Sequence, residues 1–233
     1  MKGFGSQKKS KNKKIKNLTT DNFKEQIIYK AFKFHSEGDI SEATKYYQSF
    51  IKQGYKDFRV FSNYGFILIG LGNFKEAELY LRQAIELKPD YAEAHLNLGN
   101  ILQSLGNFKE AATSTNKAIE LKPDFVIAHF NLGNILKNLG QLEDAKLSYH
   151  KAIELKPDLT SAYFSISTLQ YSNEDKIWRD QLFSDEILNK NSKKGQINIF
   201  FARANILHKE KNYKDSSKFL QLANNLKFDL NPF

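Results

Sequence analysis

The sequence predicts an all-α protein, a solenoid of about six stacked helical hairpins. Segments 90–123 and 124–157 have the same length, 34 residues, and agree at most positions. A fixed repeat of this length is typical of helical arrays in which each hairpin packs against its neighbours. The same period separates four glycines and four alanines: Gly38, Gly72, Gly106 and Gly140, and Ala43, Ala77, Ala111 and Ala145.

One period is predicted to form two helices with a turn between them. Apolar residues recur at three- and four-residue steps in the first helix, as expected of one buried face: Ala94, Leu98, Ile101, Leu102 and Leu105. Gly106 is expected to end this helix in the left-handed conformation. A second helix follows and ends before Pro123, because proline disfavours helix in the residue before it. Small side chains at Gly99 and Ala111 allow the two helices to approach closely.

These positions carry a family resemblance. Small, large and proline residues fall on the signature of the tetratricopeptide repeat at Leu98, Gly99, Leu102, Gly106, Ala111, Ala118 and Pro123. The copies at 58–91 and 126–159 repeat the pattern, so the chain resembles that family. The resemblance implies a right-handed α-solenoid in which the first helix of each hairpin lines the concave surface.

The outer copies are less regular. The predicted division is a lysine-rich tail at 1–20, a degenerate repeat at 21–57, repeats at 58–91, 92–125 and 126–159, a divergent hairpin at 160–195 and a divergent last repeat with the C-terminal end at 196–233. Helices are expected at 160–171, at 173–189 and in a hairpin over 196–226, with a loop at 189–195. Three apolar residues near the end are expected to be uncovered: Phe228, Leu230 and Phe233.

Composition and missing motifs exclude several classes of function. The sequence has no cysteine, which excludes disulfides, thiolate nucleophiles and cysteine zinc sites. It has no apolar run long enough to span a membrane and no signal-peptide core, so a cytoplasmic protein is expected. Phosphate-binding loops and catalytic serine or zinc-protease motifs are absent from the sequence. We therefore expect no enzyme activity and no cofactor.

The net charge of +9 is concentrated at one end. Seven lysines and no acid lie in residues 1–20, so without them the formal charge falls from +9 to +2. A segment this polar is expected to be disordered. We favour a solubilising role, and weak contact with nucleic acid or an anionic surface is the alternative.

Two histidines, His95 and His129, occupy equivalent positions one period apart. We interpret them as replacements for the aromatic packing residue of the repeat. The alternative, a metal site, would need a further ligand nearby.

An asparagine ladder is the candidate binding surface. Asn63, Asn97 and Asn131 are one period apart, and one helical turn on lie Phe66, Asn100 and Asn134. Asparagine is a mediocre residue inside a helix, so its repetition needs a reason. An amide offers a donor and an acceptor, which match the backbone of an extended peptide. The other candidates are Phe130, Lys137, Phe164, Gln103, Asn138 and Tyr171.

The ladder resembles that of O-linked N-acetylglucosamine transferases, which implies that Asn63, Asn97 and Asn131 hold a peptide. The other interpretation is that asparagine belongs to the repeat consensus and bonds neighbouring helices. A clamp for a free C-terminal carboxylate would need several cationic residues, and few are expected in the groove. We therefore predict that the ligand binds through an internal segment rather than through its C-terminus.

The end of the chain resembles the last repeat of bacterial proteins in which such an array leads into a sulfotransferase-like domain. Two functions therefore stand: a scaffold that binds a protein or peptide partner, or the non-catalytic recruiting arm of a sulfotransferase or glycosyltransferase.

Overall fold

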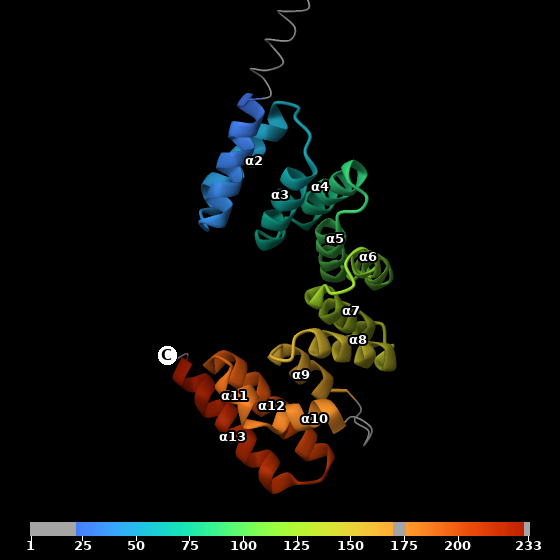
Figure 1. Cartoon of the computed structure of the whole chain (residues 1–233), viewed down its shortest axis with the longest axis vertical. Helices are drawn as coiled ribbons and strands as arrows, with labels where there is room; N and C mark the ends of the chain where they lie inside the picture. Colours follow the sequence, from blue (N-terminus) through green and yellow to red (C-terminus); the bar gives the residue numbers. More distant parts are fainter. Residues whose placement is uncertain (1–21, 170–175, 231–233) are drawn as a thin grey trace, which may run out of the picture. The chain divides into compact units, whose positions relative to one another are not determined.

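Helices are the only regular secondary structure in residues 22–169 and 176–230, the ranges that the computed structural model describes. The predicted all-α class is therefore confirmed (Figure 1). The chain divides into two compact units, residues 1–97 and 98–233. The predicted lysine-rich tail, Tyr171 and Phe233 lie outside the described residues.

The first unit consists of consecutive helical hairpins. A helix at residues 22–36 precedes α2 (Ile40–Lys52), and α3 (Phe58–Gly70) packs against α4 (Phe74–Leu87). The start of α5 (Ala92–Ser104) completes the unit. Its core is aromatic: the buried ring of Tyr64 lies 6.0 Å from that of Tyr47 and 5.1 Å from that of Tyr80.

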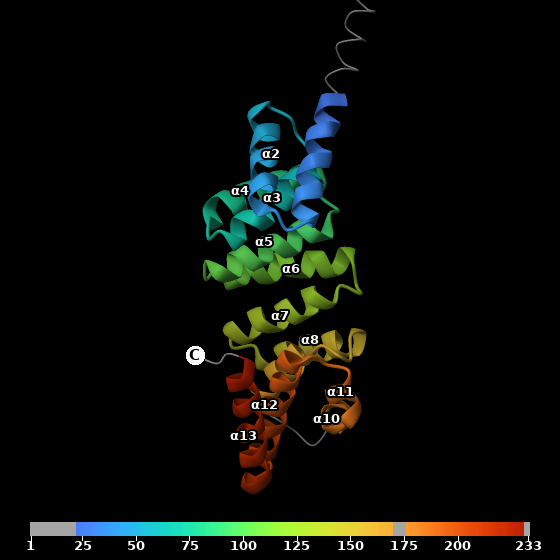
Figure 2. The same cartoon turned by 90° about the vertical axis from the view of Figure 1, so that its left-hand side faces the viewer.

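The second unit begins within α5 and continues through α6 (Phe108–Leu121), α7 (Val126–Asn138) and α8 (Leu142–Leu155). Three shorter helices follow: α9 (Thr160–Ser167), α10 (Lys176–Phe183) and α11 (Asp185–Asn189). The long hairpin of α12 (Lys193–Lys209) and α13 (Tyr213–Leu230) ends the described chain (Figure 2). Helix α9 packs against α12.

Glycine ends the first helix of the regular hairpins, as the sequence predicts. Gly106 has a φ of 79°, in the left-handed region. The amide N–H of the next residue, Asn107, reaches back to the carbonyl of Leu102 over 2.8 Å. This bond satisfies a carbonyl at the end of α5 that has no partner within the helix. Gly140 makes the same turn after α7, with a φ of 76°.

The predicted close approach of paired helices occurs at glycines inside the first helix of each repeat. A Cβ added to Gly133 of α7 would lie 2.6 Å from the Tyr149 ring of α8. A Cβ on Gly99 would lie 2.3 Å from Oγ1 of Thr115. Only glycine therefore fits at these two crossings without a shift of the neighbouring helix.

The divergent hairpin departs from the sequence prediction. Its first helix ends at Ser167, and the single helix expected at 173–189 is instead α10 and α11 with a break at Ser184. Ser184 adopts an extended conformation, with φ −70° and ψ 148°, which no helix can continue. The predicted loop at 189–195 is shorter, because α12 already begins at Lys193. The last helix runs on to Leu230 rather than ending at 226.

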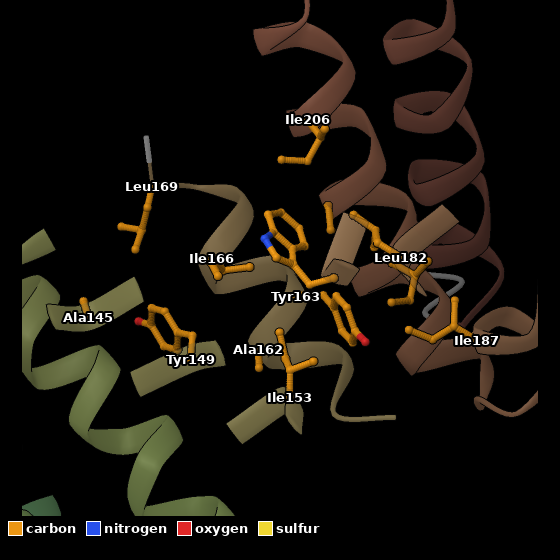
Figure 3. Close-up of a cluster of buried hydrophobic side chains, with 13 residues drawn as sticks. Ala145, Tyr149, Ile153, Ala162, Tyr163, Ile166, Leu169, Leu182, Ile187 and Ile206 are labelled. Atoms are coloured by element: carbon orange, nitrogen blue, oxygen red, sulfur yellow. The ribbon is translucent and has the colours of Figure 1, made fainter. Parts of the chain in front are cut away.

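A cluster of buried hydrophobic residues joins this divergent region to the last regular repeat (Figure 3). Tyr149 and Ile153 of α8 meet Tyr163 and Ile166 of α9. Helices α10, α11 and α12 add side chains from the other side: Trp178, Leu182, Ile187, Ile199, Ala202 and Ile206. The only tryptophan of the sequence therefore serves as a core residue of the irregular hairpin.

A buried arginine holds the break at Ser184 in place. Arg203 of α12 is 5% exposed, and its guanidinium donates to the backbone carbonyls of Leu182 and Ser184, each over 2.8 Å. Burial lowers the pKa of this guanidinium. Its charge lies 5.6 Å from the Phe183 ring and 5.4 Å from the Phe219 ring. Both the hydrogen bonds and the ring faces compensate the lost hydration.

Candidate peptide-binding face

Three of the predicted asparagines lie together in the second unit, and we call Asn100, Asn131 and Asn134 the amide row. All three are half-buried on α5 and α7. The side-chain nitrogen of Asn131 donates to Oδ1 of Asn100 over 2.6 Å, which joins α7 to α5. The hydroxyl of Tyr149 donates to Oδ1 of Asn134 over 2.8 Å. These bonds bear out the interpretation that the asparagines bond neighbouring helices.

Tyr149 extends the row towards α9. Its side chain is fully buried, which raises its pKa to about 12, and a hydrogen bond with Ser165 opposes that rise. A phenol has a single hydrogen to donate, and Tyr149 donates it to Asn134. Ser165 is therefore the donor in the second bond. The network fixes the orientation of the Asn134 amide.

Each oriented amide also has N–H donors that these bonds do not use. A primary amide carries two N–H donors and one carbonyl acceptor. Asn100 and Asn134 both use the carbonyl oxygen for the bonds within the fold. Within the described residues their Nδ2 groups have no partner, and the bonds to the two carbonyl oxygens hold them in place. The two residues are one repeat period apart, so the row presents two equivalent donor groups.

The asparagines of the first unit differ from one another. Asn63 forms a hydrogen bond with the buried hydroxyl of Tyr47, whose pKa is raised by burial. Asn97 makes no side-chain hydrogen bond within the described residues of that unit. The equivalent of Tyr47 before Asn97 is Leu81, which has no polar atom. The residue one turn on from Asn63 is Phe66, 54% exposed, whose ring stacks with that of His35 at 6.3 Å.

The remaining predicted residues have mixed environments. Phe130 is half-buried, 5.9 Å from the Tyr149 ring, and packs against the core cluster rather than standing free. Lys137 is exposed and donates to Oγ1 of Thr168 over 2.9 Å, which joins α7 to the end of α9. Phe164 is 38% exposed and is thus available to a ligand. Gln103 is half-buried and Asn138 is exposed.

The two equivalent histidines each contact a loop carbonyl, a bond that the sequence interpretation did not include. His95 lies 2.9 Å from the carbonyl oxygen of Pro89 through its Nε2 atom, and His129 lies 2.9 Å from that of Pro123 in the same way. Tyr163 makes the equivalent bond to Pro157 over 3.1 Å. Each side chain therefore ties its helix to the loop six residues earlier. Within the described residues, no group of three or more acidic or histidine side chains is placed to hold a metal ion.

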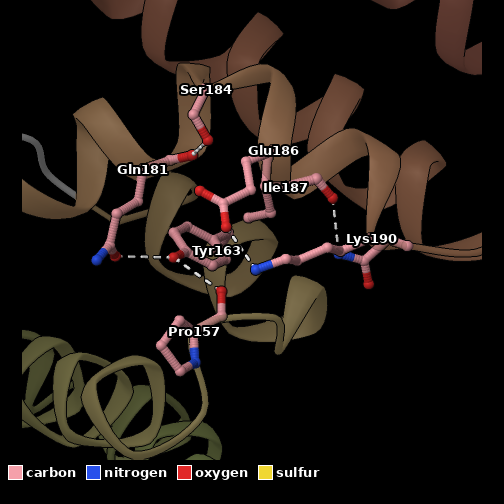
Figure 4. Close-up of polar contacts among 8 residues, drawn as sticks. Pro157, Tyr163, Gln181, Ser184, Glu186, Ile187 and Lys190 are labelled. Atoms are coloured by element: carbon pink, nitrogen blue, oxygen red, sulfur yellow. Dashed lines mark hydrogen bonds and ion pairs between the residues drawn. The ribbon is translucent and has the colours of Figure 1, made fainter.

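A hollow of about 310 Å³ lies beside Tyr163 in the second unit (Figure 4). Its polar groups bond one another: the Tyr163 hydroxyl lies 3.0 Å from Oε1 of Gln181, and Ser184 donates to the Gln181 carbonyl over 2.8 Å. Glu186 and Lys190 form an ion pair at its edge. Because these partners satisfy one another, the hollow is a structural feature of the irregular hairpin. No helix of the described residues is long and apolar enough to cross a bilayer.

Comparison with known proteins places the repeats in a family. Models of the tetratricopeptide repeat match residues 65–106, 99–140 and 126–159. Residues 65–159 are tetratricopeptide repeats. The amide row lies wholly inside these repeats, on the first helix of two successive copies. A comparison with curated protein sequences gives no match.

Solved structures share the repeat architecture. A crystal structure of MamA protein has a TM-score of 0.58 at 22% identity and covers 81% of this chain and 92% of its own. MamA from Desulfovibrio magneticus RS-1 has a TM-score of 0.55 at 16% identity and covers 88% and 96%. At these identities the likeness shows the fold alone. A match to an O-GlcNAc transferase of Thermobaculum terrenum covers 63% of this chain and 26% of that protein at 24% identity. Its TM-score of 0.47 is too low to show a shared fold.

Proposed function

We propose that the protein is a non-enzymatic interaction scaffold whose tetratricopeptide repeats bind an extended segment of a partner protein. The observation that carries the proposal is the orientation of Asn100 and Asn134. Both carbonyl oxygens accept hydrogen bonds from within the fold, so both Nδ2 groups are free to donate to the carbonyls of a bound backbone. Backbone recognition of this kind needs no particular ligand side chain.

The spacing of the donors suits an extended chain. Packed helices lie about 8–10 Å apart. An extended peptide advances about 3.3–3.6 Å per residue, so roughly three residues of ligand separate equivalent sites on successive repeats. Under this proposal Asn131 positions Asn100. Asn63, Asn97 and Phe66 of the first unit remain predicted peptide contacts of that unit.

The isosteric variant Asn100→Asp/Asn134→Asp tests this proposal. Aspartate keeps the oxygen that accepts from Asn131 and Tyr149 but has no N–H to offer. We expect the variant to fold and to lose partner binding, measured by isothermal titration with a partner segment identified by cross-linking. Asn116→Asp on the exposed surface of α6 is the matched control for the added charge. Unchanged binding by the double variant would refute the donor role.

Cross-linking locates the partner independently. A photoreactive amino acid at Gln103, one turn beyond Asn100, should capture the partner. The same group at Leu147, which is 67% exposed on α8, should capture much less. Equal capture at both positions would argue against the proposed face.

The recruiting-arm alternative uses the same face and differs only in that the protein would associate with a sulfotransferase or glycosyltransferase domain. Sulfotransferase or glycosyltransferase activity that copurifies with the captured partner would favour it. The cytoplasmic location also remains a prediction, which fractionation of the source cells would test.

A further inference from the structure

We propose that the groove between α9, α12 and α13 is a second subsite, which takes a large apolar side chain flanked by carboxylates in an internal segment of a partner protein. This inference rests on the proposed peptide-binding role and names the chemistry of the ligand at one place. The groove lies entirely within the second unit. Of its lining residues, only Phe164 is predicted from the sequence to contact a ligand.

Most of the groove lining is apolar, and we call this part the floor. Its volume is about 550 Å³, within the range of ~300–1,000 Å³ typical of ligand pockets. Phe164 contributes a ring that is 38% exposed and lies 6.2 Å from the ring of Phe201. Ile197 and Leu230 complete the apolar lining, and Leu230 is 42% exposed. A groove of this size and lining suits one aromatic or large aliphatic side chain.

The exposed cationic part of the lining is what we call the rim. Lys194 and Lys227 line it and are exposed, and neither forms an ion pair with a described residue. The remaining lining residue, Asn198, is neutral and donates to Oγ1 of Thr160 over 3.3 Å.

The surrounding helices supply almost no opposing charge. Over their whole lengths α9 and α12 contain no Asp or Glu. The nearest acid in the sequence of α13 is Asp229, two residues from Lys227, and helical residues at that spacing do not face each other. The rim is therefore complementary to carboxylates on either side of an apolar anchor.

The apolar floor and the cationic rim together favour a protein segment over other anionic ligands. A nucleic acid gains affinity from many phosphate contacts at once, and this rim offers two lysines. An apolar floor also gives nothing to a phosphate. The predicted occupant therefore has an apolar residue in the floor and acidic neighbours at the rim.

A designed peptide probes the subsite directly in the full chain. The probe is a capped, fluorescent Gly-Asp-Glu-Phe-Asp-Glu-Gly peptide, measured by fluorescence anisotropy. Replacing its Phe by Ser, or its acids by Asn and Gln, should weaken binding about tenfold or more. Binding of the neutral peptide as tightly as the acidic one would overturn the charge part of the proposal. Tighter binding of a single-stranded oligonucleotide or of anionic vesicles would overturn the choice of a protein ligand.

Charge-reversed variants locate the probe on the rim. Lys194→Glu should weaken binding about tenfold, because attraction becomes repulsion. Lys109→Glu and Lys214→Glu are matched controls, since all three lysines are the second residue of their helices, where an acid suits the helix dipole. Equal binding by Lys194→Glu and the controls would overturn the site. If circular dichroism shows that Lys194→Glu has lost helix, Lys194→Gln gives the same comparison.

A second pair of variants tests the floor. Leu230→Ser should weaken binding several-fold, whereas Leu222→Ser, 46% exposed on the same helix but outside the lining, should not. The experiments distinguish failure of this subsite from failure of the amide-row proposal. Cross-linking at Gln103 without peptide binding would remove this subsite alone, and peptide binding without cross-linking at Gln103 would remove the amide-row proposal alone.

Discussion

The side-chain nitrogen of Asn131 donates a hydrogen bond to Oδ1 of Asn100 over 2.6 Å, across successive repeats. The direction of this bond makes the two residues unequal. Asn100→Asp keeps the acceptor, so we expect its free energy of unfolding to stay close to that of the wild type. Asn131→Asp places two oxygens face to face and should lose about 1–2 kcal/mol. Urea unfolding of both variants measures the difference, and equal losses would contradict the assigned direction.

The close approach at Gly133 predicts a steric effect. An added Cβ would lie 2.6 Å from the Tyr149 ring, so Gly133→Ala should destabilise the protein by about 1–3 kcal/mol. Gly70 is the matched control, because it is also helical and a Cβ there meets nothing within 4 Å. Gly70→Ala should be neutral or stabilising by up to about 1 kcal/mol. Thermal unfolding that showed equal shifts for the two variants would contradict the packing argument.

Arg203 is expected to contribute more to the stability of the fold than the neighbouring Arg179. Arg203→Met leaves the carbonyls of Leu182 and Ser184 without their donor, so we expect a loss of about 2–4 kcal/mol. Arg179 lies over the same Phe183 ring, at 4.9 Å, but its ion pair with Glu210 is at the surface. Arg179→Met should cost about 1 kcal/mol or less. Chemical denaturation of both variants tests this order, and a reversal would show that the break at Ser184 does not depend on Arg203.

Buried tyrosines predict a loss of stability in alkali. Burial raises the pKa of Tyr149 and of Tyr163 to about 12, against an ordinary value of about 10. Between these values the unfolded chain releases a proton that the folded chain keeps, so stability falls as the pH rises from about 10 to about 12. Tyr149→Phe should flatten this fall, whereas Tyr213→Phe, at an exposed ring, should not. Unfolding free energies across this pH range provide the measurement.

The repeat period predicts the regular part of the fold because its signals are local. Gly106 sets a left-handed turn and Pro123 stops a helix through their own backbone chemistry, and α5 and α6 accordingly begin and end close to the expected residues. The break at Ser184 has no local signal of this kind. It depends on Arg203, which is distant in the sequence, and on a core that forms only when α10, α11 and α12 meet.

The same distinction applies to the candidate site. Asn97 and Asn131, like Asn100 and Asn134, lie at the same positions of α5 and α7, as the repeat register predicts. Register alone does not say which way each amide is turned, because that depends on the partner that the fold places beside it. Tyr149 is a hydroxyl donor at this position, whereas the equivalent Leu81 has no polar atom. The groove rim at Lys194 could not be predicted from the sequence, because the repeat pattern of the last hairpin is weak.

The loop bond of His129 gives a final prediction. Its Nε2 atom lies 2.9 Å from the carbonyl oxygen of Pro123, and the equivalent Tyr163 makes the same contact with Pro157 through its hydroxyl. His129→Tyr should therefore retain the bond and the melting temperature. His129→Phe keeps a ring of similar size but loses the polar atom, which should cost about 0.5–1 kcal/mol. If the Phe variant were as stable as the Tyr variant, packing of the ring rather than its hydrogen bond would hold the loop.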